Sequence, residues 1–473
     1  MADAPPTRRR ATRLLPVLLS VLLSALFGPG HARPAAAGTP TLVDEAGRHP
    51  NVLLVTVDTL RADHLGAYGY ERETSPEFDR LASEGVLFAD AITPVPTTAP
   101  ALASLLTSRH PDAHGVRENF GELPSEMQTI GEAFAAAGYS TAGFFGNGAI
   151  KNGFGQGLDR FEPFKDHWFF NDRAGTSKAI DWLESAREPW FLWIHFMDPH
   201  GPYNSSPPER SAGFTYPETP GLTRELPRVE QNHGIGVLPK YQQLPDQARV
   251  VDYVRRYDGE IAGTDLEIGK LRRALEKSKQ LTRTLVVVTA DHGESLGEDD
   301  YFFQHGGMLN EPSVRVPLLL RHPKLPAGVK TKTPASIVDV FPTLTALAGL
   351  PAPAGAVGRD LSGTLTGDPN IGQVVRVSYT VTPSRQTAVR RGRFELRGTP
   401  RRNKAADDFA KIELFDTSTT PPTRLPAGHE PAVRAELEPL LRRAARDVRE
   451  NATAPRVPTE DEQKRLRALG YID

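Results

Sequence analysis

Four apolar runs along the chain end at polar residues. The first covers residues 51–57, which read Asn-Val-Leu-Leu-Val-Thr-Val, and Asp58 follows it directly. The other three are 191–196, 285–290 and 316–320. A continuous apolar run bounded by polar residues is typical of a strand that is buried on both faces. The last run contains Pro317, which predicts that this strand lies at a sheet edge or begins there.

Segments with helical spacing lie between and beyond these runs. They cover residues 76–85, 99–107, 127–137, 252–275 and 336–347. Two of them end close to a glycine, Gly138 and Gly349, which is typical of a helix end. Because strands alternate with helices, we expect an α/β fold with a mainly parallel sheet that helices cover on both sides.

Polar residues that can carry chemistry lie at the ends of three predicted strands. Asp58 follows the first, His195 and Asp198 lie at the end of the second, and Asp291 and His292 follow the third. In parallel sheets, ligands bind beyond the carboxyl ends of the strands. We therefore expect these side chains to meet in one site. Taken singly, Asp58 is also a common helix cap and Asp291 a common turn residue.

Residues 1–37 are expected to be a signal peptide with its cleavage region. Arginines at 8–10 and 13 precede an apolar run at 14–27, and small residues follow it. This order is typical of a secretory signal, and the run is short for a membrane span. We expect an exported protein that is periplasmic, secreted or associated with the cell envelope, and an uncleaved anchor is the alternative.

The rest of the chain divides by composition into four parts. They are a linker at 38–48, a main domain at 49–373 with an insertion loop at 203–246, a small C-terminal subdomain at 374–450 and a tail helix at 451–473. The insertion is rich in Pro, Ser, Gly and Glu and breaks the strand–helix pattern. The C-terminal subdomain has short strand-like runs followed by one helix, which predicts an α+β unit.

Composition excludes some partners. The 473 residues carry a formal net charge of −2, which gives no electrostatic case for binding nucleic acid. The chain has no cysteine, which excludes disulfides and a lipoprotein anchor. No feature of the sequence indicates an obligate protein partner.

Residues 97–107 read Thr-Thr-Ala-Pro-Ala-Leu-Ala-Ser-Leu-Leu-Thr and resemble the nucleophile segment of the sulfatases. That segment runs Cys or Ser, any residue, Pro, Ser, Arg, two small residues, Leu, Leu, Thr, Gly. The nucleophile position is Thr98 here, and the arginine position is Leu102. Thr97 is the rival nucleophile, which the register against Pro100 disfavours.

The resemblance extends from residue 51 to the C-terminus. Further matching motifs lie at 51–58, 61–63, 289–294, 305–306, 311, 315–318, 337–344 and 466–472. In this order they identify the chain as a member of the sulfatase group of the alkaline phosphatase superfamily. The resemblance implies an alkaline phosphatase-like sulfatase fold, in which 49–373 is the catalytic domain.

The nucleophile position departs from the family in a way that changes the chemistry. A sulfatase oxidises its Cys or Ser to an aldehyde, whose hydrate attacks sulfur and later expels sulfate. Thr98 carries a methyl group on Cβ and cannot give an aldehyde. A threonine sulfate has no geminal hydroxyl to drive its breakdown, whereas water can attack a threonine phosphate in line under metal activation. The sequence therefore favours phosphorus over sulfur.

One divalent metal is the predicted cofactor. Its ligands are expected to be Asp58, Asp291 and His292, with Thr98 Oγ1 or substrate as the fourth contact. The nitrogen ligand favours Zn²⁺ or Mn²⁺ over Ca²⁺. The sulfatases proper have a second aspartate where this chain has Thr59, and an asparagine in place of the histidine. These departures resemble the threonine-using branch with phosphoethanolamine transferases, glycerophosphate transferases and phosphodiesterases.

Two further histidines are assigned through the resemblance. The segment 195–203 matches the family's His-x-Pro loop. By this match His200, together with His305, is expected to contact the substrate's non-bridging oxygens or to protonate the leaving group. A second metal held by Asp198, His200 and His305 is an alternative that the sequence does not favour. Arg61 and Asp63 are expected to form an ion pair.

These expectations combine into one leading hypothesis and two alternatives. The leading hypothesis is an exported metallohydrolase that cleaves or transfers a phosphate ester or phosphodiester through Thr98. The first alternative is a sulfuric ester hydrolase that acts without formylglycine. The second is a catalytically inactive family member that binds anions or glycans at the cell envelope. The expected substrate is an ester of a small molecule, glycan or lipid.

Overall fold

The computed structural model describes residues 41–150, 152–163, 172–245, 247–365, 374–380, 385–401, 404–419, 421–450, 459–460, 463–464 and 467. The predicted signal peptide, the first residues of the predicted linker and most of the predicted tail helix lie outside these residues. In the part of the chain that the structure describes, every helix is too short or too polar to span a bilayer.

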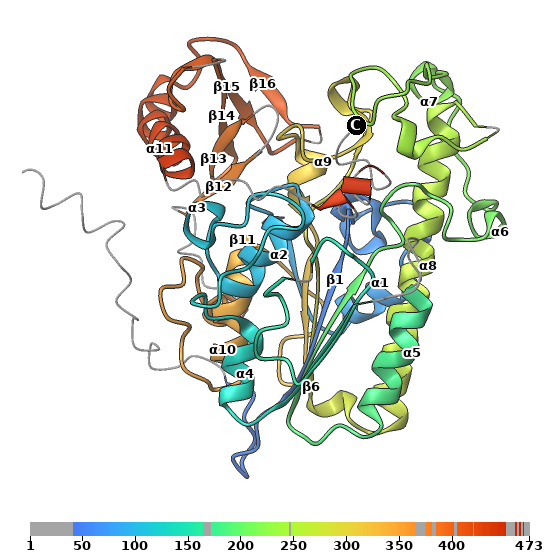
Figure 1. Cartoon of the computed structure of the whole chain (residues 1–473), viewed down its shortest axis with the longest axis vertical. Coiled ribbons are helices and arrows are strands. Elements are labelled where there is room, and N and C mark those ends of the chain that lie inside the picture. The colour runs from blue at the N-terminus through green and yellow to red at the C-terminus, as the bar shows by residue number, and fades with distance from the viewer. Residues whose placement is uncertain are drawn as a thin grey trace, which may run out of the picture.

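A large sheet forms the centre of the molecule, and helices cover both of its faces (Figure 1). In the described residues its order is β11-β2-β10-β6-β1-β5-β3-β4, with β9 also paired to β2. The strands are β1 (Asn51–Val57), β2 (Val86–Ile92), β3 (Ser140–Phe145), β4 (Arg160–Pro163), β5 (Trp190–Phe196), β6 (Thr284–Ala290), β9 (Arg315–Val316), β10 (Leu318–Arg321) and β11 (Val329–Ser336). Most neighbours are parallel, and β9 and β10 are antiparallel to theirs. The predicted fold class is confirmed.

The strand with the proline begins where the sequence predicts but does not lie at an edge. β10 starts directly after Pro317 and lies between β2 and β6. Because the proline precedes the ladder, its missing N–H removes no ladder hydrogen bond. Its carbonyl oxygen accepts a hydrogen bond from Thr289 Oγ1 at 2.7 Å.

The helices pack in two layers. The α2, α4 and α10 helices lie on one side of the sheet, and α1, α5 and α8 lie on the other (Figure 1). The helices of this domain are α1 (Pro76–Ser83), α2 (Thr98–Thr107), α3 (Pro111–His114), α4 (Ile130–Ala136), α5 (Asp172–Leu183), α6 (Pro208–Ser211), α7 (Pro220–Thr223), α8 (Val250–Lys277), α9 (Glu311–Val314) and α10 (Val340–Leu347). The start of α4 has a capping box of Thr129 and Glu132, which satisfies backbone donors at that end.

A second, antiparallel sheet forms the C-terminal subdomain. Its strands are β12 (Val375–Tyr379), β13 (Thr387–Arg391), β14 (Phe394–Pro400), β15 (Phe409–Asp416) and β16 (Thr423–Leu425). The long helix α11 (Pro431–Glu450) packs Leu437 and Leu441 against this sheet. Arg376 on β12 donates to both carboxylate oxygens of Asp90 on β2, at 2.9 and 2.6 Å, and so ties the subdomain to the large sheet.

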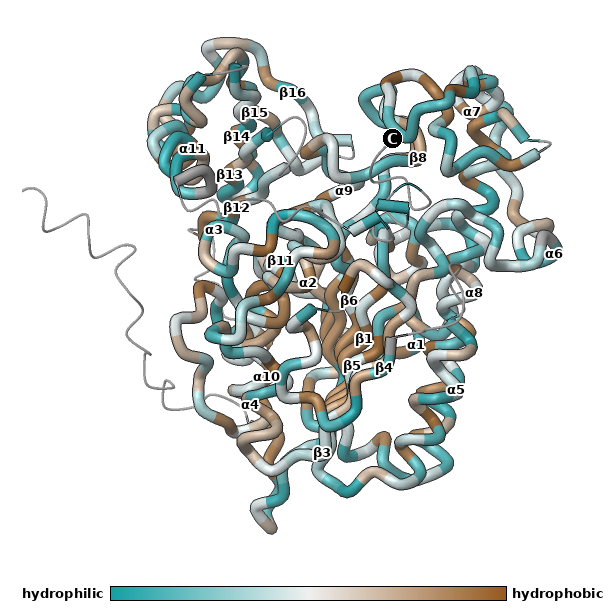
Figure 2. Tube along the Cα trace, viewed as in Figure 1, coloured by the Kyte–Doolittle hydropathy of each residue, from teal (hydrophilic) through white to brown (hydrophobic). Residues whose placement is uncertain are grey.

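The register of the central strands positions the site. Val57 of β1 lies opposite Phe196 of β5 and Ala290 of β6, so the three strands end at the same level. All residues of these strands are buried, and they form the hydrophobic centre seen in Figure 2. Burial on both faces explains their continuous apolar runs. The residues that follow these strands therefore emerge side by side. Close by, β7 (Ser295–Leu296) and β8 (Phe302–Gln304) form a short hairpin.

Candidate active site

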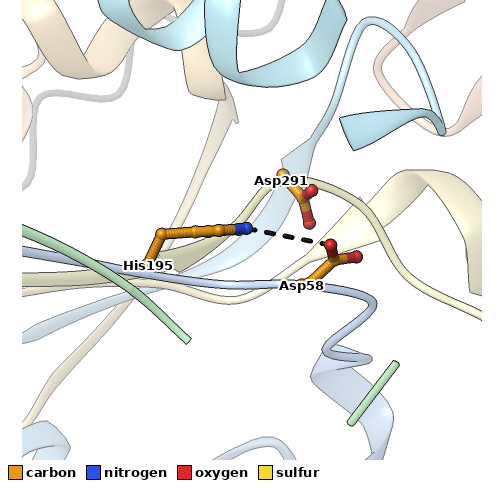
Figure 3. Close-up of side chains that lie close together, drawn as sticks. All are labelled: Asp58, His195 and Asp291. Carbon is orange, nitrogen blue, oxygen red and sulfur yellow. Dashed lines mark ion pairs between the residues drawn. The ribbon is translucent and has the colours of Figure 1, made fainter. Parts of the chain in front are cut away.

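Two carboxylates and an imidazole meet at the ends of β1, β5 and β6. Asp58, His195 and Asp291 each offer a ligand atom, and these atoms all lie within 4.8 Å of one another (Figure 3). All three residues are buried. Asp58 Oδ1, Asp291 Oδ2 and His195 Nε2 have no hydrogen-bond partner. Buried polar atoms are normally paired, and carboxylates crowded in the interior are normally compensated by a cation. The cluster therefore fits a divalent metal.

The charge of the two carboxylates is unevenly shared. Burial raises the pKa of Asp291 well above its usual range, and the negative charge of Asp58 raises it further. Burial also pushes the pKa of Asp58 upward, but the nearby imidazoles of His200, His195 and His292 outweigh burial and lower it. Opposite shifts in a pair of buried acids indicate mutual repulsion, which a divalent cation would relieve.

His292 also faces these carboxylates. Its Nε2 lies 3.6 Å from Asp58 Oδ1 and 3.6 Å from Asp291 Oδ2. On the other side of the ring, Nδ1 lies 2.9 Å from the carbonyl oxygen of Gly293, which fixes the proton on Nδ1. Burial, with a further contribution from His305, lowers the pKa of His292 to about 3. The ring is therefore neutral, which is the form that binds metals.

Thr98 lies at the start of α2 and joins this group. Its Oγ1 lies 3.3 Å from Asp58 Oδ2 and 3.4 Å from His292 Nε2. Thr97, the rival nucleophile, is the N-cap residue, and its Oγ1 lies beside Gly306. The structure thus brings Thr98, Asp58, Asp291 and His292 together, as the sequence predicts.

The neighbouring helix amide is already occupied. The N–H of Ala99 donates to Asn119 Oδ1 at 2.9 Å. This amide is therefore not available to stabilise an oxyanion, because a side-chain oxygen from the following loop accepts its hydrogen bond. The dipole of α2 still makes its N-terminus favourable for an anion.

Thr59 stands where the sulfatases carry a second aspartate and does not replace it as a ligand. Its hydroxyl donates to the carbonyl oxygen of Asp58 at 2.8 Å. Its backbone has φ 56°, a left-handed conformation that is unusual for a β-branched residue. This conformation is accompanied by a hydrogen bond from its amide to Asp291 Oδ1 at 3.3 Å. Tyr257 on α8 holds the same turn by donating to the carbonyl oxygen of Thr59 at 2.7 Å.

His200 and His305, the two histidines assigned by resemblance, lie next to His292. The rings of His200 and His305 are 5.1 Å apart, and those of His305 and His292 are 4.5 Å apart. His305 Nδ1 lies 3.0 Å from Glu294 Oε1, and Tyr203 donates to the other oxygen of Glu294 at 3.1 Å. Burial lowers the pKa of His305 to about 4 and raises that of Glu294 to about 7. This pair can therefore hold one shared proton near neutral pH.

A second metal at Asp198, His200 and His305 gains no support from the described residues. Asp198 pairs instead with Asp172 on α5, whose amide lies 3.4 Å from Asp198 Oδ1. Burial raises the pKa of Asp198 to about 6. Among the described residues, the possible metal ligands that lie within 4.8 Å of one another are instead Asp58, His195 and Asp291.

Sequence patterns alone did not indicate the role of several residues that border the site. Asn147 donates to Asp58 Oδ2 at 3.1 Å and follows β3, so it obeys the same strand-end rule as Asp58. The segment before it, Ser-Thr-Ala-Gly-Phe-Phe, is too mixed to be recognised as a buried strand. Glu294 belongs to a motif that the sequence singles out, but its link to His305 depends on folding. Arg61 and Asp63 form the expected ion pair at 2.8 Å.

Comparison with known proteins identifies the family of the chain. A model of the sulfatase family matches residues 50–350. A sulfatase of Formosa agariphila is 27% identical over 358 residues, covering 64% of this chain and 70% of the relative. An ulvan-active sulfatase of the same organism is 28% identical and covers 66% of this chain and 64% of the relative. A choline-sulfatase of Rhizobium meliloti is 27% identical, with coverages of 64% and 68%.

Two solved structures share the fold. A protein in complex with its substrate D-glucosamine-2-N,6-O-disulfate matches with a TM-score of 0.69 at 20% identity, over 85% of this chain and 99% of its own. The phosphonate monoester hydrolase of Agrobacterium radiobacter matches with a TM-score of 0.67 at 20% identity, over 84% and 96%. At such identities the likeness shows the fold alone.

The comparisons bear unevenly on the expected chemistry. The names of the relatives above support the sulfuric ester alternative better than the phosphate hypothesis. The threonine-nucleophile variant and the resemblance to phosphoethanolamine transferases are not confirmed. The family match covers more than half of the sequence and includes all the predicted ligands. This chain belongs to the sulfatase family, and it is a hydrolase of that family.

Proposed function

We propose that this hydrolase cleaves an anionic ester by attack of Thr98 at the ester's central atom. The observation that carries the proposal is the position of Thr98 Oγ1, 3.3 Å from Asp58 Oδ2 and 3.4 Å from His292 Nε2. A divalent metal bound by Asp58, Asp291 and His292 would make the hydroxyl more acidic and neutralise the ester's oxygens. We propose Zn²⁺ or Mn²⁺, because an imidazole belongs to the ligand set.

A sulfuric ester is the first candidate substrate. Its support comes from the relatives, which are a sulfatase, an ulvan-active sulfatase and a choline-sulfatase. Since Thr98 cannot become an aldehyde, a sulfated Thr98 would be released by water attacking sulfur, which restores the hydroxyl. We propose a sulfated small molecule or glycan as the substrate class.

A phosphate ester or phosphodiester is the second candidate, and the nucleophile favours it. The methyl group on Cβ of Thr98 excludes the aldehyde chemistry that makes sulfate release easy. Water can attack a phosphorylated threonine at phosphorus, and an acceptor alcohol can do the same in a transferase. The fold permits both candidates, because the structures that share it include a phosphonate monoester hydrolase.

A substrate panel on metal-reconstituted protein tests this proposal. Apo protein is loaded with Zn²⁺, Mn²⁺ or Ca²⁺ and assayed with 4-nitrophenyl sulfate, 4-nitrophenyl phosphate and bis(4-nitrophenyl) phosphate. We expect hydrolysis of the sulfate, or of a phosphate if the second candidate is correct, with Zn²⁺ or Mn²⁺ and not with Ca²⁺. Stoichiometric metal without hydrolysis of any ester would instead indicate a binding protein without catalytic activity.

His305 is the proposed source of the leaving-group proton. The Glu294 carboxyl lies against Nδ1, so it can pass its proton to the ring while the opposite Nε2–H passes to the departing oxygen. We expect His305→Gln to lower kcat/KM by about 10²-fold or more for alkyl esters. The loss for 4-nitrophenyl esters is expected to be much smaller, because nitrophenolate departs without a proton. The measurement is kcat/KM against leaving-group pKa.

A matched control for this prediction is His114→Gln. His114 is also buried, but it bonds to Ser104 on α2 at 2.9 Å and lies outside the metal cluster. Equal losses for good and poor leaving groups in His305→Gln would contradict the proton-donor role and leave only a positioning role.

We also propose that the protein is exported and acts in the periplasm, at the cell envelope or outside the cell. The proposal rests on the arginines at 8–10 and the apolar run at 14–27. Fractionation of cells that express the full chain, with N-terminal sequencing of the mature protein, tests it.

A further inference from the structure

We infer that His195 is a ligand of the metal in this site, and that Thr56 and Trp193 are positioning residues that hold its ring in the ligating form. The inference rests on the metal site of the proposed function and adds a second imidazole to it. It does not depend on which ester is cleaved.

The Nε2 atom of His195 faces the two carboxylates without a hydrogen-bond partner. It lies 3.7 Å from Asp58 Oδ2, which is too long for a hydrogen bond. The side chain of His195 is completely buried. An unpaired buried nitrogen is unfavourable, so its position at the carboxylates needs a physical reason.

The opposite ring nitrogen shows which tautomer is present. His195 Nδ1 lies 2.9 Å from Thr56 Oγ1, and the indole Nε1 of Trp193 donates to the same oxygen at 2.9 Å. Thr56 Oγ1 also lies 3.5 Å from the carbonyl oxygen of Ile194. An indole N–H only donates, so it occupies one lone pair of the hydroxyl. The other lone pair can accept Nδ1–H of His195, while the hydroxyl hydrogen points to Ile194.

This arrangement leaves Nε2 with a free lone pair directed at the acids. In the opposite tautomer the Thr56 hydroxyl would donate to Nδ1, and His195 would carry a buried Nε2–H at 3.7 Å from its nearest carboxylate oxygen. That N–H would have no partner, which is costly. With a cation in the cluster, the first tautomer satisfies every group, and the second does not. Such outer contacts commonly orient metal-binding histidines.

The spacing of Asp58, His195 and Asp291 agrees with a shared cation, because one ligand atom of each lies within 4.8 Å of the others. Metal–ligand bonds of about 2.0–2.1 Å place neighbouring ligand atoms about 3.0–3.6 Å apart. Nε2 of His195 lies 3.7 Å from one oxygen of Asp58, and Nε2 of His292 lies 3.6 Å from the other. The two imidazoles therefore approach the same carboxylate, each through its own oxygen. Two nitrogen ligands strengthen the preference for Zn²⁺ over Ca²⁺, which takes oxygen.

The test compares Thr56→Val with Thr289→Val. These threonines lie opposite each other on β1 and β6, and both are fully buried. The Thr289 hydroxyl donates to the carbonyl oxygen of Pro317 and does not contact His195. Zn²⁺ and Ca²⁺ affinities of the apo full-chain proteins are measured by chelator competition. We expect Thr56→Val to weaken Zn²⁺ binding by about 10-fold to 100-fold, and Thr289→Val to leave it unchanged.

A direct variant and a spectrum complete the experiment. His195→Asn is expected to weaken Zn²⁺ binding more than Thr56→Val does, to affect Ca²⁺ much less, and to change the visible absorption of the Co²⁺-substituted protein. Far-UV circular dichroism of the apo proteins checks folding. If Thr56→Val does not fold, Trp193→Phe replaces it, with Trp190→Phe as its control, because the Trp190 indole donates to Gln280 instead.

The outcomes separate this inference from the proposed function. Wild-type affinity for Zn²⁺ and an unchanged Co²⁺ spectrum in His195→Asn would overturn the assignment of His195 and leave the rest of the site intact. Equal losses in Thr56→Val and Thr289→Val would overturn the positioning role. Failure of the wild-type protein to bind any divalent metal would overturn the metal site of the proposed function and this inference together.

Discussion

Replacing Thr98 by valine is expected to lower kcat/KM by at least about 10³-fold, which is a loss of about 4 kcal/mol of transition-state stabilisation. Valine keeps the branched shape of the buried side chain at the start of α2 and removes only the hydroxyl. Loss of a nucleophile is among the largest effects that one substitution causes. Thr98→Ser keeps the hydroxyl and is expected to retain activity within about 10-fold.

Metal content and intermediate trapping give this prediction its control. Both variants are expected to bind metal, because Asp58, Asp291 and His292 remain. Rapid quenching of the wild-type enzyme, followed by accurate mass measurement of the peptide with residue 98, distinguishes a sulfated from a phosphorylated threonine. Near wild-type turnover in metal-loaded Thr98→Val would show that water, and not Thr98, attacks the ester.

The sequence predicted best where burial and backbone direction act together. The apolar runs of β1, β5 and β6 follow from burial on both faces, and this pattern is visible without a structure. Parallel strands that end at one level must bring their following residues together. The meeting of Asp58 with Asp291 and His292 was therefore predictable. The position of Thr98 beside them was predictable too, because the motif fixes the register of α2.

Other features depend on contacts that sequence patterns do not encode. An apolar run looks the same in a parallel and in an antiparallel central strand. The antiparallel placement of β10 between β2 and β6 was therefore not predictable. The proposed role of His195 depends on a ring orientation that is set by Thr56, which lies opposite it on β1, and by Trp193, two residues before it on β5. The methyl group on Cβ of Thr98 favours a phosphate ester, whereas the names of the relatives favour a sulfate ester, and strand patterns do not decide between the two.

Asp291→Asn is expected to abolish metal binding and, unexpectedly for a lost ligand, to stabilise the apo protein. Asparagine can still accept the amides of Thr59 and His292 through Oδ1, which lie at 3.3 and 2.7 Å from the native oxygen. Its amide group takes the place of Oδ2, which is unpaired, and removes the repulsion with Asp58. A metal at about 1,000 times its Kd stabilises by about 4 kcal/mol, which the variant loses.

The sign of the pH dependence follows from the raised pKa of Asp291. In the unfolded chain this carboxyl ionises near pH 4, whereas in the folded apo protein it ionises only at much higher pH. The folded state therefore binds the extra proton, and the apo wild type loses stability as pH rises above about 4. Urea unfolding of both apo proteins at pH 5 and pH 8 should show the advantage of Asp291→Asn growing with pH.

Asp265→Asn is the matched control for this prediction. Asp265 on α8 is also buried, accepts two backbone amides, from Glu77 and Phe78, and has a pKa that burial raises to about 7. Asp265 lies outside the group of Asp58, His195 and Asp291. We therefore expect apo Asp265→Asn to be more stable than the apo wild type, by a difference that grows with pH. The variant is expected to keep the full stabilisation by Zn²⁺. Because Asp291 is adjacent to Asp58 and Asp265 is not, only Asp291→Asn should erase the difference between apo and metal-loaded protein. Retention of that difference in Asp291→Asn would remove Asp291 from the ligand set and place the cation elsewhere.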